Sequence, residues 1–239
     1  MTSRISLPTS AASRTTEGRA DRPAPGRRFP AGPAVLLVVG VIVLGATLVA
    51  RHGPGEDPGW ANAPPELRAI LWPEPIPVRP FELVDQREHP FGPAQLQGRW
   101  TFMFFGYLQC PDVCPMAMHV LRDYRRAFVE AFPDTPHQVV FVSVDPEYDR
   151  PAQIADYMDF FDPDFIGLSG SDEALAELAG PLAIKYYEFV DEHGRRSIDH
   201  TSSIMIVDPS GRVMGAFPPP QRPQQMLEQF AALRRHFAL

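Results

Sequence analysis

Hydrophobic residues follow three patterns along this chain, and each pattern predicts a different kind of element. Residues 31–50, AGPAVLLVVGVIVLGATLVA, are 20 residues without a charge. As a helix they span about 30 Å, the thickness of the hydrocarbon core of a bilayer. Nearly unbroken apolar runs at 100–108 (WTFMFFGYL) and 139–145 (VVFVSVD) are typical of buried central strands. Elsewhere apolar residues recur at helical spacing. The pattern therefore indicates a membrane anchor followed by an α/β domain.

The predicted helices and strands alternate along the domain. One helix is expected from Pro115 to about Phe132, with an apolar stripe made of Met116, Val120, Tyr124 and Phe128. A second helix opens at Pro151 and turns four residues inward, namely Ile154, Tyr157, Met158 and Phe161. The remaining elements are a strand and turn at 81–91, a short helix around 174–179, a hairpin of 202–208 with 212–217, and a last helix at about 223–237. This order predicts a mixed central sheet flanked by helices.

The composition divides the chain into four predicted parts. Residues 1–30 are rich in Ser, Thr, Arg and Pro without periodicity, and are expected to form a disordered cytoplasmic tail. Residues 31–50 form the transmembrane anchor, 51–79 a proline-rich, fairly stiff spacer, and 80–239 the folded domain. A cleaved signal peptide is the alternative for 31–50, but its apolar region is usually about 7–15 residues long. Leu48 also occupies the −3 position of the only plausible cleavage site, which follows Ala50.

The distribution of charge orients the anchor and argues against one class of partner. Residues 1–51 contain seven arginines against two acidic residues, a net charge of +5, whereas the whole chain carries −7, so the rest carries −12. Arginines before the span place the N-terminus in the cytoplasm by the positive-inside rule. We therefore expect a single-pass protein of the cell inner membrane, with its C-terminal domain outside, which is the periplasm if the source is a Gram-negative bacterium. An acidic domain is a poor partner for phosphate backbones, so we expect no nucleic-acid binding.

The only two cysteines, Cys110 and Cys114, follow the strand predicted at 100–108, at the edge where α/β sheets place their sites. A structural disulfide would close a five-residue loop and contribute only about 2 kcal/mol. A redox-active pair is supported by the start of a helix, which lowers thiol pKa values, although Asp112 between the thiols opposes this effect. A metal site requires at least one further ligand. Among the seven histidines, His200 is distinguished because it immediately precedes a buried-looking strand.

Three motifs resemble one known family. CPDVCP at 110–115, VSVDPEYD at 142–149 and DHTSSIMIVDPSG at 199–211, in that order, closely resemble the Sco/SenC proteins. These are membrane-anchored copper chaperones that help to assemble the binuclear copper centre of cytochrome c oxidase subunit II. The resemblance covers roughly residues 75–238 and implies a thioredoxin-like fold. It also implies a copper donor and a thiol reductant as partners, both unidentified.

The resemblance implies a copper site built from Cys110, Cys114 and His200. Two thiolates and one imidazole suit Cu(I), and the same set holds Cu(II) with an added ligand. Zinc is the chemical rival, but a structural zinc site requires a fourth protein ligand, and none is evident. Asp199 is a candidate to orient His200 by a hydrogen bond, the alternative being that it only ends a loop. Asp145 matches a family aspartate near the site and is a candidate for partner contact or tuning, or else an exposed loop carboxylate.

Two functions follow from this resemblance, and they use the same cysteines. One is a membrane-anchored metallochaperone that delivers copper to cytochrome c oxidase subunit II. The other is an enzyme, a thiol–disulfide reductase that keeps the copper-ligand cysteines of the oxidase reduced and itself cycles through a disulfide between Cys110 and Cys114. His200 distinguishes the two, because dithiol exchange has no obvious need of it. A thiol peroxidase or redox sensor is disfavoured, since no activating arginine is evident beside the motif.

Extra thioether ligands from Met116 and Met118 are a further alternative to a core role for these residues.

Overall fold

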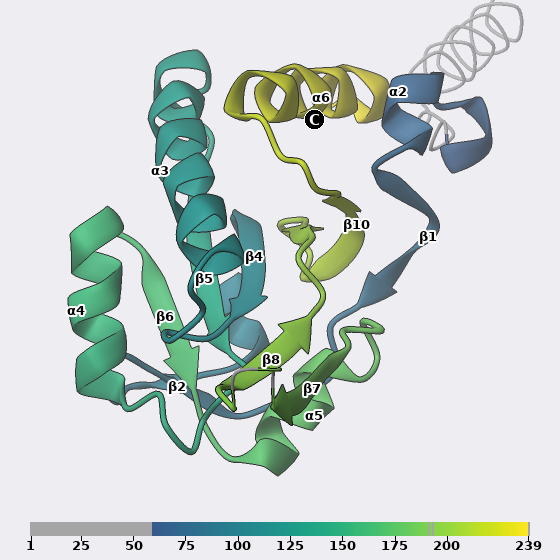
Figure 1. Ribbon diagram of the computed structural model, residues 1–239. Helices are drawn as coiled ribbons and strands as arrows, with labels where there is room; N and C mark the ends of the chain where they lie inside the picture. The colour runs from purple at the N-terminus through teal and green to yellow at the C-terminus, as the bar shows by residue number, and fades with distance from the viewer. Residues whose placement is uncertain (1–58, 191, 193, 239) are drawn as a thin grey trace, which may run out of the picture. The chain divides into compact units, whose positions relative to one another are not determined.

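A mixed sheet forms the centre of the computed structural model, which describes residues 59–190, 192 and 194–238 (Figure 1). The predicted tail and anchor, 1–30 and 31–50, lie outside the described residues. Eight strands are hydrogen-bonded in the order β1 (Leu71–Pro77), β10 (Arg212–Phe217), β9 (Ile204–Val207), β4 (Trp100–Gly106), β5 (His137–Ser143), β6 (Ile166–Ser169), β2 (Leu83–Asp85) and β3 (Pro90–Phe91). Strands β4, β5 and β6 are parallel to one another and the other pairings are antiparallel, which confirms the predicted mixed sheet.

The apolar runs at 100–108 and 139–145 form the central strands β4 and β5, as predicted. All seven residues of β4 are buried, and β4 pairs along its whole length with β5. Helices α3 (Val113–Ala131), α4 (Pro151–Phe161), α5 (Asp172–Ala179) and α6 (Pro223–Phe237) complete the domain, with the short helices η1 (Trp60–Asn62), α2 (Pro65–Arg68) and η2 (Pro93–Leu96). Phe102 of β4 packs its ring against Tyr124 of α3 and Phe230 of α6, at centroid distances of 4.8 and 5.7 Å. These aromatic contacts join two helices to the centre of the sheet.

The apolar face of α3 differs from the predicted stripe at its N-terminal half. Tyr124 and Phe128 are fully buried as expected, but Met116 is 57% exposed and Met118 lies in the core. The buried face of the helix is made of Cys114, Ala117, Met118, Leu121, Tyr124 and Phe128. The strict four-residue repeat was therefore wrong before Tyr124, because a 3.6-residue period carries the buried face through positions three and four apart.

The predicted proline-rich spacer was wrong for residues 60–77, which belong to the folded domain. Leu67, Ile70 and Leu71 are buried, and β1 pairs with β10 in antiparallel register. Gly215 of β10 permits this approach, because a side chain there would overlap the carbonyl oxygen of Ile70. β1 holds three prolines, which lack an N–H, and a strand tolerates them only at the edge of a sheet. Its edge position explains why a stretch rich in proline is nonetheless a strand.

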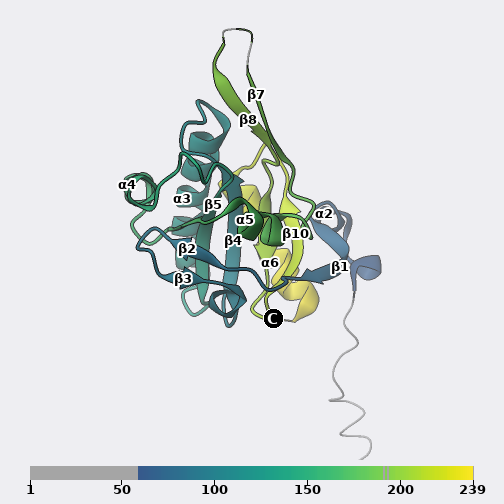
Figure 2. The ribbon, with the colours of Figure 1, turned by 90° about the horizontal axis from the view of Figure 1, so that it is seen from below.

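A second, two-stranded sheet was not predicted. Strands β7 (Tyr186–Val190) and β8 (Arg196–His200) pair as an antiparallel hairpin that is separate from the main sheet. Figure 2 shows this hairpin protruding from the body of the domain. Four of the five β7 residues are exposed, so the strand lacks the buried positions from which strands are recognised in sequence. His200 is the last residue of β8.

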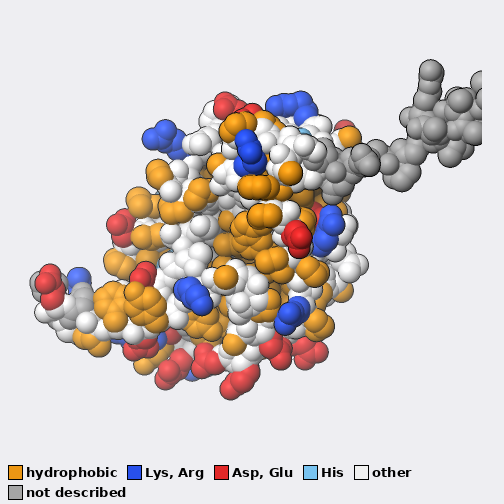
Figure 3. Space-filling model, turned by 90° about the vertical axis from the view of Figure 1, so that its right-hand side faces the viewer, with side chains coloured by type: hydrophobic (Ala, Val, Ile, Leu, Met, Phe, Trp, Pro, Cys, Tyr) orange, Lys and Arg blue, Asp and Glu red, His pale blue; other side chains and the backbone are white. Residues whose placement is uncertain are grey.

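The outer surface is mixed in character. Figure 3 shows one face on which apolar side chains spread over much of the surface, acidic side chains gather along the lower edge and basic ones are scattered. Within residues 59–190, 192 and 194–238, no helix combines the length and apolar content needed to cross a bilayer.

Candidate metal centre

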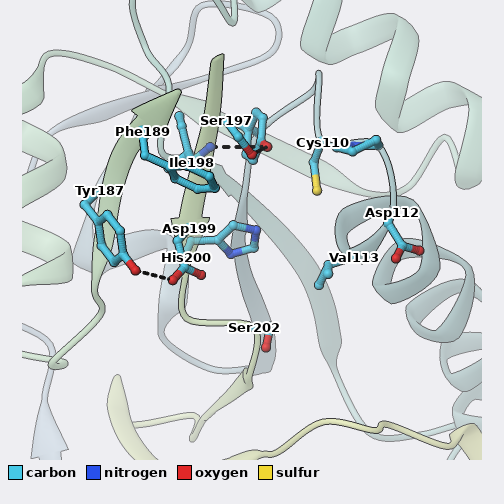
Figure 4. A pocket seen from close by; sticks show the side chains of 12 residues that line it. Cys110, Asp112, Val113, Tyr187, Phe189, Ser197, Ile198, Asp199, His200 and Ser202 are labelled. Carbon is cyan, nitrogen blue, oxygen red and sulfur yellow. Dashed lines mark hydrogen bonds between the residues drawn. The ribbon is translucent and has the colours of Figure 1, made fainter. Parts of the chain in front are cut away.

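Three elements bring two sulfurs and one imidazole together. Cys110 lies in the loop after β4, Cys114 in the first turn of α3 and His200 at the end of β8. One ligand atom from each lies within 4.8 Å of the other two, and Cys114 Sγ is 3.3 Å from His200 Nε2. In Figure 4, Cys110 and His200 approach the same space from opposite walls of a pocket. Among the described residues this is the one group of three or more His, Cys, Asp or Glu side chains spaced for a metal ion.

The surroundings of His200 determine which ring nitrogen faces the cysteines. Its Nδ1 lies 3.2 Å from the carbonyl oxygen of Thr201, which only accepts hydrogen bonds, so Nδ1 carries the proton. Nε2 is then left with a free lone pair on the side of Cys114. The edges of Phe104 and Tyr107 meet the imidazole at centroid distances of 5.9 and 6.0 Å. A ring held by a backbone acceptor and two aromatic neighbours is preorganised to bind a metal through Nε2.

The two thiols differ sharply in acidity. The pKa of Cys110 is lowered to about 3, first by a hydrogen bond from the Cys114 thiol and further by the backbone N–H groups of Asp112 and Cys114. The N–H of Cys114 lies 3.4 Å from Cys110 Sγ. The pKa of Cys114 is raised, because it donates to Cys110 and is buried. The start of α3 thus stabilises a thiolate at Cys110 only. The metal-free site contains one thiolate and one thiol, and binding through both sulfurs releases a proton.

Gly106 makes room for the buried thiol. Cys114 is fully buried, whereas Cys110 is half-buried. A Cβ added at Gly106, the last residue of β4, would lie 2.8 Å from Cys114 Sγ and 3.0 Å from ring atoms of both Phe104 and Phe141. This glycine was not among the residues predicted for the site. Its signal was its position at the end of the central strand, a few residues before the cysteines.

His200 does not donate a hydrogen bond to Asp199, so this expectation is wrong. The Asp199 carboxylate instead accepts a hydrogen bond of 2.6 Å from the hydroxyl of Tyr187, across the β7–β8 hairpin. Successive side chains on a strand point to opposite faces, so adjacent residues of β8 are directed apart. The backbone carbonyl of Thr201 supplies the contact to Nδ1 that Asp199 was expected to provide.

Asp145 follows β5 and is not an exposed loop carboxylate. It is 3% exposed and accepts two hydrogen bonds from Arg196, at 2.7 and 2.8 Å. Arg196 is the first residue of β8, so the pair joins the loop after β5 to the strand that ends in His200. Arg196 was not predicted from the sequence, because no local pattern relates it to an aspartate 51 positions away.

A cleft of about 460 Å³ is lined by Cys110 and His200, while Cys114 is buried and does not line it. Its walls are largely apolar or aromatic and include Tyr107, Pro111, Val113, Tyr187, Phe189 and Ile198. Phe189 and Val113 are 42% and 41% exposed, so an apolar rim surrounds the opening. A metal at this site remains accessible to a partner, unlike one in a closed structural site.

The other sulfur and imidazole candidates lie elsewhere. Met118 is a core residue, and Met116 is exposed on α3. His119 packs edge-to-face against Phe161 at a centroid distance of 4.9 Å. Neither cysteine is part of a disulfide, so the predicted disulfide is not present in this structure.

The fold and the site define a thioredoxin-like α/β protein with a Cys–Cys–His cluster at the C-terminal end of its central strand. A family model described as SCO1/SenC matches residues 74–235. The chain therefore belongs to the SCO1/SenC family, and the predicted resemblance is confirmed.

Individual relatives agree with this assignment. A mitochondrial SCO2 homologue from Mus musculus is 34% identical over 160 residues, which cover 66% of this chain and 61% of the mouse protein. The chain thus matches less than two thirds of the mouse protein. The structure of ScoI from Bradyrhizobium japonicum is 33% identical with a TM-score of 0.57, and that of Arabidopsis thaliana ScoI is 26% identical with a TM-score of 0.62. Each match covers 66% of this chain and 98% of the solved chain, and both structures contain bound copper.

Proposed function

We propose that this protein is a copper metallochaperone in which Cys110, Cys114 and His200 bind copper. The observation that carries the proposal is the convergence of two sulfurs and one imidazole nitrogen within 4.8 Å, with Cys110 and His200 lining an open cleft. This soft, low-coordinate donor set suits Cu(I), and Cu(II) requires one more ligand. Relatives with copper bound support copper over zinc, as does the presence of only three candidate ligands among the described residues.

Delivery by ligand exchange uses the features of this site. A thiolate of the recipient forms a bond to copper as a bond to Cys110 or Cys114 breaks, and the oxidation state of copper does not change. The released Cys114 thiolate takes up a proton, because its pKa in the metal-free protein is raised. We propose cytochrome c oxidase subunit II as the recipient, with an unidentified copper donor and an unidentified reductant of the cysteine pair. We further propose that residues 31–50 anchor the chain in the inner membrane, with the domain on the periplasmic side.

Copper titration of the reduced full chain tests the site. We expect one Cu(I) per chain in competition with a chromophoric chelator, and preference for copper when zinc is supplied together with it. Cys110→Ser should abolish stoichiometric binding, and His200→Ala should weaken it. His119→Ala, which changes a histidine packed on Phe161 and away from the cluster, is the matched control and should bind copper normally. Binding of wild-type strength by both His200→Ala and Cys110→Ser would show that the proposed site is wrong.

One observation favours the reductase as a second candidate. An accessible thiolate at Cys110 beside a buried thiol at Cys114 is the arrangement of an attacking and a resolving cysteine. This activity would make the protein an enzyme with Cys110 and Cys114 as its catalytic pair. If His200→Ala fully supports oxidase assembly while each cysteine remains essential, the reductase is the better description.

A further inference from the structure

The loop that follows β5 supports the cysteine side of the site. The carboxylate of Asp149 accepts the backbone N–H of Leu108 at 3.1 Å, two residues before Cys110. The same oxygen accepts the hydroxyl of Ser143 at 2.7 Å, and that hydroxyl oxygen accepts the N–H of Asp145 at 3.0 Å. Asp149 is 1% exposed, so these bonds lie in the interior. The loop is therefore tied to the chain segment that carries the first cysteine.

The same loop also holds the histidine side. Both carboxylate oxygens of Asp145 accept hydrogen bonds from the guanidinium of Arg196. That guanidinium lies over the ring of Tyr148 at 4.3 Å and is 2.8 Å from a carboxylate oxygen of Glu188. Arg196 opens β8 and His200 closes it, on one five-residue strand. One loop thus contacts both segments from which the candidate ligands come.

The hairpin depends on such anchors for its position. It forms a sheet of its own, and an isolated two-stranded hairpin is marginally stable at best in water. Besides Arg196, the hydroxyl of Tyr107 contacts Ser197 Oγ at 3.2 Å and accepts the N–H of Ile198 at 3.3 Å. A forked pair between a guanidinium and a carboxylate constrains direction as well as distance. The pair between Asp145 and Arg196 therefore fixes both the position and the orientation of β8.

We propose that Arg196 is a positioning residue for copper: its clamp on Asp145 holds β8 so that His200 Nε2 stays within reach of the two sulfurs. The inference rests on the proposed copper function of Cys110, Cys114 and His200. Loss of the clamp should affect the two halves of the site differently. His200 becomes free to move, while the loop and helix that carry the cysteines remain in place.

The test compares Arg196→Gln with wild type in the full chain. Residues that orient metal ligands typically contribute about 10- to 100-fold to metal affinity. We expect a loss of Cu(I) affinity in that range and, in the Cu(II) form, loss of the nitrogen hyperfine coupling in the electron paramagnetic resonance spectrum. Arg196→Lys keeps the positive charge but cannot donate two parallel hydrogen bonds, so it should retain only part of the copper affinity and of the nitrogen coupling. Glu188→Gln removes the exposed partner of Arg196 and is the matched control, with both signals expected at wild-type values.

A double variant distinguishes positioning from general destabilisation. If Arg196 acts through His200, Arg196→Gln combined with His200→Ala should bind copper no more weakly than His200→Ala alone. Additive losses, or wild-type affinity and nitrogen coupling in Arg196→Gln, would overturn the inference and leave the copper site intact. Failure of the wild type to bind copper would instead overturn the proposed function.

A double variant in which both residues are uncharged tests the proposal if Arg196→Gln does not fold. Arg196→Gln leaves the Asp145 carboxylate buried without its cation, which is strongly destabilising. Asp145→Asn with Arg196→Gln removes both charges and retains hydrogen-bonding groups. Loss of affinity and of nitrogen coupling in this pair supports the clamp, whereas wild-type values for both overturn it.

Discussion

Cys114 Sγ and His200 Nε2 lie 3.3 Å apart although 86 positions separate the two residues in the chain. The first is fully buried at the start of α3, and the second closes a hairpin outside the main sheet. Neither residue alone distinguishes a redox pair from a metal site. Their contact places an imidazole lone pair beside the Cys114 thiol, and this arrangement supplies a third candidate ligand to the cysteine pair.

The unequal thiols lead to an expectation about reactivity. Because the pKa of Cys110 is lowered to about 3, its thiolate is fully populated above roughly pH 5, and its alkylation rate should be nearly constant between pH 5 and 8. An ordinary thiol reacts about tenfold faster with each pH unit in that range. Cys114 should react far more slowly, because it is buried and its pKa is raised. Iodoacetamide labelling of the metal-free protein with mass spectrometry measures both rates. A tenfold rise per pH unit at Cys110 would contradict the expectation.

Asp149 should make stability depend on pH. Burial raises the pKa of this carboxyl to about 6. A group with a raised acid pKa binds protons more tightly when folded, so the folded state is favoured at low pH and loses this advantage as pH rises from about 4 to 6. The loss reaches up to about 3 kcal/mol at pH 7. Between pH 4 and 7, the unfolding free energy of the wild type should fall with rising pH relative to that of Asp149→Asn.

Other carboxylates contribute to the pH dependence of both proteins, so the difference between the two curves is the informative quantity. Asp85 has a lowered pKa, owing mainly to backbone hydrogen bonds from His89 and Arg87 that outweigh its desolvation, and therefore acts in the opposite direction. Asp85→Asn is the matched control. It should remove stability that is present above about pH 4, and parallel curves for Asp149→Asn and wild type would refute the role of Asp149.

Gly106→Ala should displace the buried thiol. The added methyl group would lie 2.8 Å from Cys114 Sγ and 3.0 Å from two ring atoms that are buried and cannot easily move. Overpacking of a core typically costs about 1–3 kcal/mol, and the shifted sulfur should also weaken Cu(I) binding. Thermal unfolding and copper competition measure the two effects separately. An unchanged melting temperature together with unchanged copper affinity would be inconsistent with this packing.

Asp199→Asn should leave copper affinity within about threefold of wild type. Its carboxylate accepts from Tyr187, while the Thr201 carbonyl contacts His200 Nδ1, so the variant does not remove the group that orients the imidazole. Tyr187→Phe removes the donor of the same bond and should behave alike. Cu(I) competition measures both variants. A loss of tenfold or more in Asp199→Asn would mean that this carboxylate orients the imidazole after all.

Local patterns in the sequence predicted most of the central structure. The apolar runs located β4 and β5, the proline at 151 located the start of α4, and the turn at 208–211 located the hairpin of β9 and β10. The stretch that became β1 was misread, because its prolines indicate a linker unless the partner strand at the sheet edge is known. The hairpin of β7 and β8 was missed, because its exposed positions carry no alternating pattern.

The sequence by itself determined the α/β order of elements and the identity of the three candidate ligands, because buried runs, turns and motifs are local properties of the chain. Only the tertiary structure decided how those ligands are held. The pair of Asp145 with Arg196, the bond of Asp199 to Tyr187 and the space that Gly106 leaves for Cys114 all join segments that meet only after folding. Hydrogen-bond direction and close packing depend on three-dimensional position, and spacing along a chain does not encode it.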